Sequence, residues 1–454
     1  MDSTATSADR QVRMRLLKHS RSIRAASSVI VALLASVGSV ASLSADECVE
    51  LHAGSECADA WCCSLLEAQS LTGDWLGMRS TLAESGISFN ADVTQFYMGV
   101  VDGGVERDFN AVGHADYVIN LDSSKLGGPQ GLFFKLRAEH RWGDGIGDLT
   151  GTLLPPALAG DLPTPDSDHV YLTNILFTQA LSEQFAVFFG KLDTLDGDLN
   201  AYAHGRGKSQ FSNVAFVATP VGLRTIPYST FGAGFVVLGE GGVPIFTMSF
   251  LDPVERSTDN DISDAFSEGV TVAPELRVPV TLFDRPGHQL IGATWSSREY
   301  VALDQDPRVL LPRIPIARRT GSWSVYWNFD QTLFVNPDDE TKGWGVFGRA
   351  GVADPNTNPI EAFMSFGVGG NSPIPGRSGD RFGVGWYYTK TSEELAPFIA
   401  AVVGGVGDSQ GVELFYNAEV TPWFYLTPDV QYISPARDAV DDMWLMGIRG
   451  QIIF

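Results

Sequence analysis

The chain has few charged residues for its length, and very few of them are basic. Only 19% of its 454 residues are charged, and 31 Lys and Arg face 54 Asp and Glu, which gives a formal net charge of −23. A nucleic-acid-binding protein presents Lys and Arg to phosphates, so this balance excludes that class. The hydrophobic content of 44% excludes a disordered acidic chain, because it provides enough apolar surface to bury.

Long hydrophobic runs are absent after residue 45. No later window approaches the roughly 18 to 20 uninterrupted apolar residues that a membrane-spanning helix needs. This excludes a helical membrane protein for the body of the chain. We expect that body either to be soluble or to enter a membrane by some means other than a helix.

The first 45 residues differ in composition from the remainder. They contain six Lys or Arg and two acidic residues, then an apolar stretch over 25–43 and small residues at 42–45. This order predicts a secretory signal peptide over 1–45. Met14 is an alternative start that would give the basic region an ordinary length. A transmembrane anchor is the alternative interpretation, but acids follow the apolar stretch where a basic stop-transfer cluster is expected.

Cysteine is scarce and confined to one short segment. In an exported protein four cysteines allow three pairings, so we expect a disulfide-tied extension over residues 46–70. Zinc binding with His52 is an alternative, although the spacing does not repeat a CxxC pair. A lipoprotein cysteine is disfavoured, because Asp46 and Glu47 stand where small residues should precede it. We assign the segment no chemistry; its cysteines are Cys48, Cys57, Cys62 and Cys63.

From about residue 88 onward, apolar and polar residues alternate in runs of 9 to 14 residues. A period of two is typical of strands whose two faces meet different surroundings. We count about seventeen such runs, separated by turn-rich segments. A closed single-chain barrel of the bacterial outer-membrane kind needs an even number. We interpret the run at 211–219 as a loop and predict sixteen strands, with eighteen as the alternative.

The run 131–142 carries four ionised side chains on one face. Each would cost several kcal/mol if desolvated in a dry core, so we expect this face to contact water. The charged face consists of Lys135, Arg137, Glu139 and Arg141, and the opposite face of Leu132, Phe134, Leu136 and Ala138.

Two all-β architectures fit this pattern. A soluble β-sandwich or β-solenoid would direct its apolar faces to a shared core. A transmembrane barrel would direct them to lipid and enclose the charged faces around water. Aromatic residues near strand ends favour the barrel, because interfacial girdles need them, and so does the C-terminal Phe454. The girdle candidates are Trp142, Tyr171, Trp295, Tyr300, Trp344, Trp386, Tyr387, Tyr388, Trp423, Tyr425 and Trp444.

Several long blocks resemble one known family. The segment LTGDWLGMRSTLAESGI looks like the one that precedes the first strand in the OprB-type carbohydrate-selective porins, and the resemblance continues over nearly the whole predicted mature chain. The cysteine segment before residue 70 is not part of this resemblance. The blocks that carry it are 71–87, 172–211, 286–300, 327–360, 365–388 and 413–436.

The resemblance implies a closed antiparallel barrel over 71–454 in the outer membrane of a Gram-negative-type bacterium, usually with sixteen strands. It implies passive diffusion of monosaccharides or small oligosaccharides into the periplasm, with outer-membrane lipid as the surroundings. No cofactor, metal or nucleic acid is implied. Such channels work as homotrimers or monomers, and both stay open here.

Sugar selection needs hydrogen-bonding groups for hydroxyls and aromatic platforms for ring faces. The charged face of 131–142 supplies both signs of charge and is the first predicted pore lining. The polar, Gly-rich segment 190–211 is too long for a simple turn, so we predict that it folds inward as a constriction loop. A calcium loop is the alternative for its acids. Its candidate residues are Asp193, Asp196, Asp198, His204, Arg206 and Lys208.

Strand alternation extends the predicted lining to other runs. It identifies a face but not which residues touch solute. The nominated residues are Asp92, Asn120, Arg349, Glu413, Asn417, Glu419, Asp429 and Gln431.

Two other function classes fit less well. A barrel hydrolase needs a nucleophile, a base and an orienting group, and none of the seven His lies in a nucleophile motif. We therefore predict no catalytic residue. A structural or adhesive barrel with a blocked lumen is the second alternative, and it would conduct no ions.

Overall fold

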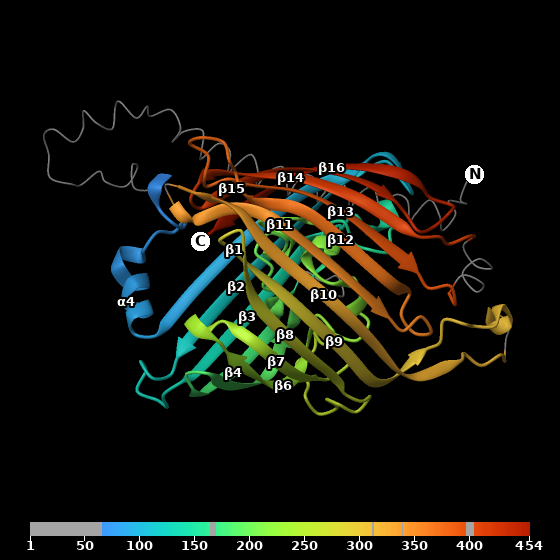
Figure 1. The fold of residues 1–454 in the computed structure, drawn as a ribbon, viewed down its shortest axis with the longest axis horizontal. Helices are drawn as coiled ribbons and strands as arrows, with labels where there is room; N and C mark the ends of the chain where they lie inside the picture. The colour runs from blue at the N-terminus through green and yellow to red at the C-terminus, as the bar shows by residue number, and fades with distance from the viewer. Residues whose placement is uncertain (1–65, 164–168, 311–312, 338, 396–403) are drawn as a thin grey trace, which may run out of the picture.

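The computed structural model describes residues 66–163, 169–310, 313–337, 339–395 and 404–454, and these form a closed β-barrel (Figure 1). The predicted signal segment and all four cysteines lie outside the described residues. Every strand pairs antiparallel with its chain neighbours, and β1 pairs with β16 to close the barrel. No helix in the described part of the chain is long and apolar enough to cross a membrane.

The described residues form sixteen strands, which confirms the predicted number. The run at 211–219 is not a strand: it contains the single helical turn α7, Val214–Val217, which begins where the Asn213 side chain accepts a hydrogen bond from the Ala215 backbone N–H. The strands are β1 Ile87–Gly104, β2 Phe109–Asp122, β3 Leu132–Gly143, β4 Val170–Ser182, β5 Phe185–Asp193, β6 Ser229–Leu238, β7 Pro244–Leu251, β8 Thr271–Leu282, β9 Arg285–Val301, β10 Arg318–Asn336, β11 Asp339–Ala353, β12 Ile360–Asn371, β13 Arg381–Thr391, β14 Ser409–Thr421, β15 Phe424–Ser434 and β16 Asp441–Ile453.

The helical elements are short and lie in the segments between strands or before β1. The α-helices besides α7 are α4 Met78–Glu84, α5 Gly147–Thr150 and α6 Leu158–Asp161. The 3-10 turns are η1 Trp75–Gly77, η2 Thr194–Gly197, η3 Gly205–Gly207, η4 Pro220–Gly222, η5 Glu240–Gly242 and η6 Pro307–Leu310.

The two ends of the barrel differ in their connections. At one end β4 and β5, β8 and β9, and β14 and β15 are joined by two residues each, and β1 begins there. At the other end β3 and β4 are joined by 144–169, and β5 and β6 by 194–228. Bacterial outer-membrane barrels have short periplasmic turns and longer extracellular loops. We therefore call these the turn end and the loop end.

Strand β14 shows the predicted alternation clearly. Leu414 is 50% exposed on the outer face, whereas Glu413 and Phe415 on either side of it are buried. Because successive side chains point to opposite faces, the apolar set of β14 lies on the outside of the barrel. An exposed apolar surface of this kind is suited to lipid.

The predicted aromatic girdles are only partly present. Trp295 and Trp444 are exposed on the barrel, but Tyr300, Tyr387 and Trp423 are buried, so the girdle assignment of these three is wrong. Tyr387 packs against Phe216 of the segment inside the barrel, at a ring distance of 5.9 Å. Proximity to a strand end does not determine which face a side chain occupies.

Residues 194–228, here called the inner segment, lie inside the barrel. Their side chains and backbone bond to strands around most of the wall. Arg206 and Lys208 contact β1, β2 and β3, Asn200 bonds to Asn328 of β10, and Ser212 bonds to Glu413 of β14. A segment that contacts opposite walls of a closed barrel must cross its interior. The inward folding predicted for 190–211 is therefore observed.

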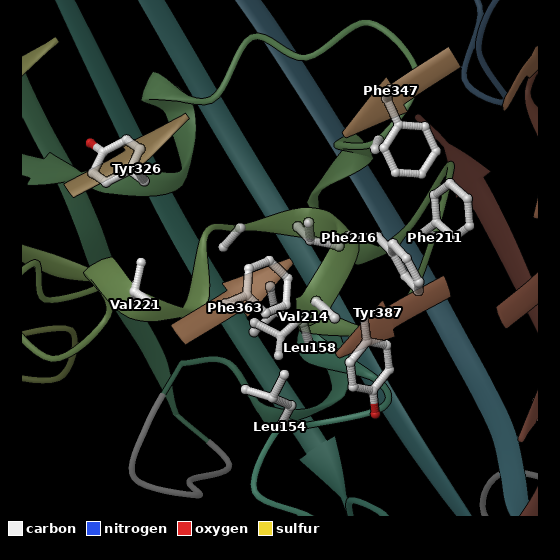
Figure 2. Close-up of a cluster of buried hydrophobic side chains, with 14 of the residues drawn as sticks. Leu154, Leu158, Phe211, Val214, Phe216, Val221, Tyr326, Phe347, Phe363 and Tyr387 are labelled. Carbon is white, nitrogen blue, oxygen red and sulfur yellow. The ribbon is translucent and has the colours of Figure 1, made fainter. Parts of the chain in front are cut away.

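A hydrophobic core lies within the barrel, between the inner segment and one side of the wall. Figure 2 shows Phe211 and Phe216 of the inner segment beside Phe347 and Tyr387 of the wall. The Phe211 ring lies 4.6 Å from that of Phe216 and 5.2 Å from that of Phe347. Much of the interior is thus protein, and water has access only to the remainder.

Glycines in β13 make this packing possible. A Cβ atom on Gly385 would lie 2.5 Å from the Phe216 ring, and one on Gly383 would lie 2.7 Å from the Phe211 ring. Since real Cβ atoms do not approach carbon so closely, both positions require glycine for the inner segment to reach the wall.

Candidate functional site

Strand β3 and the inner segment form a network of ion pairs, here called the charge network. Arg137 of β3 donates to Asp193 at 2.5 Å and to Asp196 at 2.7 Å, and Lys135 donates to Asp196. Glu139 accepts from Arg206 at 3.0 Å. The charged face of β3 thus meets opposite charges at the end of β5 and in the inner segment, residue by residue.

Arg206 is the centre of the charge network. Its guanidinium donates to Glu139, Asp193 and Asp196 at 2.8–3.0 Å, and also to the Tyr228 hydroxyl at 3.0 Å. The local sequence His-Gly-Arg-Gly-Lys, residues 204–208, explains how the Arg206 side chain is oriented.

The turn around Arg206 has left-handed backbone angles: φ is +65° at Gly205, +53° at Arg206 and +75° at Gly207. Glycine adopts these angles without steric cost, so only Arg206 is strained. The ion pairs of Arg206 hold it in this conformation.

Lys208 extends the network to β1 and β2. Its ammonium lies 2.8 Å from a carboxylate oxygen of Asp92 and also binds Asp116. Burial would lower the pKa of Lys208, but the charges of Asp116 and Asp92 outweigh it and raise the pKa. Lys208 therefore stays charged at neutral pH and ties the inner segment to the barrel wall.

Most of the charge network is buried. Glu139 is 0% exposed and Arg137 and Arg141 are each 7% exposed, so the prediction that this whole face contacts water is wrong for these three residues. The end of β5 and the inner segment supply the countercharges that β3 alone lacks, and paired charges can be buried where unpaired ones cannot.

One edge of the charge network does contact water. The side chain of Lys135 is 28% exposed and that of its partner Asp196 is 25% exposed, and Asp92 is 21% exposed. We call these three residues the wet edge. Burial would raise the pKa of Asp196, but Arg137, Arg206 and Lys135 lower it to about 2. Asp196 therefore stays negatively charged at neutral pH.

A cavity of about 290 Å³ lies beside Lys135 towards the turn end, and we call it the turn-side cavity. Its walls include Asn120 and Ser88, whose side chains bond to each other at 3.3 Å, and the ring of Phe133, which is 44% exposed. Amide, hydroxyl and ammonium groups beside an aromatic ring suit a hydroxylated solute with apolar ring faces.

A second cavity of about 340 Å³ lies towards the loop end, and we call it the loop-side cavity. Its lining includes Tyr228 and Thr194, which adjoin the charge network, and Leu158 of α6. Lys135 and Tyr228 thus connect the network to one cavity each. Within the wet edge, Lys135 lines the turn-side cavity, and Asp196 lies in η2 with Thr194 and Leu195, which line the loop-side cavity.

The acidic residues of the charge network are already paired with basic residues, which argues against a metal site among them. His114, Asp116 and Glu139 have potential ligand atoms within 4.8 Å of one another, but Asp116 already binds Lys208 and Glu139 binds Arg206. The calcium alternative for Asp193, Asp196 and Asp198 meets the same objection, because arginines neutralise all three.

Comparison with known proteins identifies the family. The model of the carbohydrate-selective porin, OprB family, matches residues 106–454. The chain belongs to the OprB family. Porin B of Pseudomonas aeruginosa is 22% identical over 435 residues, covering 85% of this chain and 91% of that protein. The high-pH structure of Pseudomonas putida OprB has 20% identity and a TM-score of 0.73, covering 86% of this chain and 99% of the other. Its low-pH structure has 17% identity and a TM-score of 0.53, with the same coverage.

Membership of the OprB family makes this protein an outer-membrane porin for sugars, as the resemblance implied. The outer apolar face of the barrel is then the lipid-facing surface, and the route for solute is the part of the interior that the inner segment leaves open. Within this OprB-family barrel, the predicted lining residues fall into three groups.

The first group belongs to the charge network: Lys135, Arg137, Glu139, Asp193, Arg206, Lys208 and Asp92. Arg141 lies next to it on β3 and donates to the Gly160 carbonyl at 3.1 Å. Asn120 lines the turn-side cavity.

The second group is buried, so its predicted role as water-exposed lining is wrong, and most of its members anchor the inner segment. Arg349 of β11 binds Asp198 at 2.7 Å and the carbonyls of Ala203 and Phe216. Glu413 accepts from the backbone N–H groups of Ser212 and Asn213. Asp429 and Gln431 bond to Ser212 of the inner segment, whereas Asn417 is buried but bonds to Thr427 of β15.

The third group lies away from both. The backbone N–H of Glu419 bonds to Asp380 in the turn between β12 and β13, far along β14 from the anchors. His204 uses its backbone N–H to bond to Gln210 at 2.6 Å, and burial lowers the pKa of its ring. The structure therefore does not bring these two residues into the charge network.

Four important residues were not nominated from the sequence. Asp116 and His114 belong to the charge network, Tyr228 bonds to Glu139, and Arg449 of β16 holds the carbonyls of Gly207 and Gln210. The alternation of β2 places His114 and Asp116 on one face, which is a usable signal. Tyr228 lies in a loop, where alternation gives no information.

Proposed function

We propose that sugars cross this porin by passing from the loop-side cavity, along the wet edge of Lys135, Asp196 and Asp92, into the turn-side cavity. The observation that carries the proposal is the partial exposure of these three charged side chains beside the two cavities, when most of the rest of the network is buried. Fixed charges of both signs provide donors and acceptors for hydroxyl groups.

The charges of the wet edge also explain selectivity. Opposed charges orient water across the passage, whereas a neutral sugar carries no charge to be repelled. The buried part of the network keeps the inner segment in place, so the width of the passage is fixed. Passage is then passive diffusion without a conformational step.

We further propose that the chain has no catalytic activity. The charged residues pair with one another instead of surrounding a nucleophile, and Tyr228 is bound to both Arg206 and Glu139. An adhesive barrel with a blocked lumen is the competing proposal, and the two cavities beside the charge network argue against it.

Each chain closes its own barrel through the pairing of β1 with β16, so one chain encloses one complete route. A homotrimer would then contain three independent channels and a monomer one. Conductance steps in groups of three would support the trimer.

Replacing Lys135 with alanine tests the route. Loss of a positive charge at the wet edge should shift ion selectivity towards cations. A hydrogen bond contributes about 0.5–1.5 kcal/mol net, so block of the current by glucose should weaken by about two- to tenfold. Reversal potential in a KCl gradient and glucose titration in planar bilayers measure both effects.

Lys342→Ala is the matched control, because this lysine lies on β11 in an ion pair with Asp339, outside the network and both cavities. It removes the same charge and should leave glucose block unchanged. Equal effects of the two substitutions would mean that Lys135 does not contact the permeating sugar.

A further inference from the structure

The segment before β1 displays two apolar side chains to solvent. Leu76 is 104% exposed and Met78 is 59% exposed. Trp75 and Leu76 have left-handed backbone angles, with φ of +50° and +60°, which non-glycine residues seldom adopt. A backbone of this kind persists only where the surrounding contacts impose it. We call Trp75, Leu76 and Met78 the turn-end patch, because they precede β1, which begins at the turn end.

The turn-end patch is fixed to the barrel by bonds on both sides of it in the chain. Before it, the Leu71 backbone N–H donates to the Ile453 carbonyl at 2.8 Å. After it, Nη2 of Arg79 donates to the Phe89 carbonyl of β1 at 3.0 Å. The Arg79 guanidinium carbon also lies 5.6 Å from the centroid of the Trp75 ring. The fold itself therefore holds the patch in its exposed position.

The Trp75 ring joins the turn-end patch to the outer face of the barrel. Its centroid lies 5.8 Å from that of the Phe89 ring. Phe89 has the same parity in β1 as Tyr97, which is 49% exposed, and the opposite parity to Asp92, which binds the inner segment. Because successive side chains of a strand point to opposite faces, Phe89 lies on the outer, lipid-facing surface. The turn-end patch is therefore continuous with that surface.

The turn-end patch lies at the periplasmic edge of the membrane-spanning wall. Phe89 is the third residue of β1, and Figure 1 shows α4 beside the start of this strand. Tryptophan is enriched where a bilayer meets water, because its ring is apolar and its N–H is polar. Apolar side chains next to it can enter the boundary between head groups and acyl chains. Moving Leu76 from water into that boundary is favourable, since it removes apolar surface from water.

From this arrangement we propose that the turn-end patch is a lipid anchor, with Leu76 and Met78 inserted into the periplasmic leaflet of the outer membrane. The proposal rests on the outer-membrane position of the barrel and not on the sugar route, so the two proposals can fail separately. The other candidate occupants of the patch are a periplasmic protein and the part of the chain before residue 66. Continuity with the lipid-facing surface favours lipid over both.

Insertion of the turn-end patch would also steady one wall of the turn-side cavity. Ala83 of α4 and Gly86 line that cavity, and Gly86 leads directly into β1. A Cβ atom on Gly86 would lie 2.8 Å from the Cβ atom of Lys125 and 2.9 Å from the Asp122 carbonyl oxygen. The segment that carries the patch thus passes closely against the turn between β2 and β3, so anchoring it in lipid restrains the cavity wall.

The test places a diazirine amino acid at position 76 of the full-length protein in a bacterial outer membrane. Light converts the diazirine to a carbene, which inserts into the molecule beside it, and mass spectrometry identifies the adduct. We expect phospholipid adducts. Adducts with a periplasmic protein in place of lipid, adducts with residues 1–65 in place of lipid, or reaction with water alone would each overturn the proposal.

Two other leucines of the chain calibrate the yield of lipid adducts. A diazirine in place of Leu414, which is 50% exposed on the lipid-facing side of β14, should give lipid adducts in a yield similar to that at position 76. A diazirine in place of Leu199, which is 40% exposed in the inner segment, should react with water only. A yield at position 76 as low as that at position 199 would contradict insertion.

Trp75→Ala tests whether the contact with Phe89 positions the turn-end patch. Without the Trp75 ring, the diazirine at position 76 should lose most of its lipid adducts. Trp444→Ala is the matched control, because Trp444 is 45% exposed on the outer face of β16 near the loop end, and it should leave these adducts unchanged. Heat-modifiable mobility on gels checks that each variant is folded. Equal loss in both variants, or no loss in Trp75→Ala, would contradict the positioning role of Trp75.

Discussion

Replacing Arg206 with alanine should release the inner segment from β3 and increase the conductance of the channel. Arg206 bonds to three carboxylates and the Tyr228 hydroxyl, and Glu139 and Asp193 are buried beside it. Removing one partner of a buried ion pair leaves an uncompensated charge and costs about 3–5 kcal/mol. The inner segment can avoid this cost by moving so that water reaches the acids, which widens the passage. Single-channel recording and chemical denaturation measure the two consequences.

A second substitution makes this prediction specific. Adding Asp193→Asn to Arg206→Ala removes one of the stranded charges, so it should recover part of the lost stability and reduce the conductance towards the wild-type value. Arg308→Ala, which breaks an exposed pair with Asp306 in a loop, should change stability by no more than about 0.5 kcal/mol. Wild-type conductance and stability in Arg206→Ala would show that the charge network does not hold the inner segment.

Placing arginine at Leu414 should prevent stable insertion of the barrel. Leu414 lies in the middle of β14 on the outer face, opposite Val384 and Val430 of the neighbouring strands. An arginine on the lipid face near the bilayer midplane costs about 2–4 kcal/mol. The protein should therefore be lost from the outer-membrane fraction and lack heat-modifiable mobility.

Gln410→Arg is the matched control for this substitution. Gln410 is exposed on the same face of the same strand but near its end, opposite Ser434. Near the membrane interface the cost of arginine falls to about 0–1 kcal/mol, so this variant should insert. Normal insertion of both variants would contradict the assignment of this face to lipid.

Strand facing was predictable because alternation is a local property. The outward position of Leu414 and the inward position of Glu413 follow from the sequence of β14 alone, whatever lies opposite them. The even number of strands that a closed barrel needs showed that one of the seventeen runs was miscounted, but it did not by itself single out 211–219. The OprB resemblance added the family and its usual strand number.

The surroundings of the inner face were not predictable in the same way. Arg137 and Glu139 are buried because Asp193 and Arg206, more than fifty residues later in the chain, fold back onto them. Alternation identifies an inner face but cannot distinguish water from a folded segment. Phe347 is an apolar example: this aromatic residue on the inner face is explained by its contacts with Phe211 and Phe216 of the inner segment.

Titration of the purified protein with glucose in a planar bilayer tests the central claim most directly, because it asks whether sugar and ions share one route through the barrel. The predicted result is an open channel whose ion current falls and saturates as glucose increases, with no glucose consumed. A membrane that shows no channels, or a current that stays constant at every glucose concentration, would contradict it.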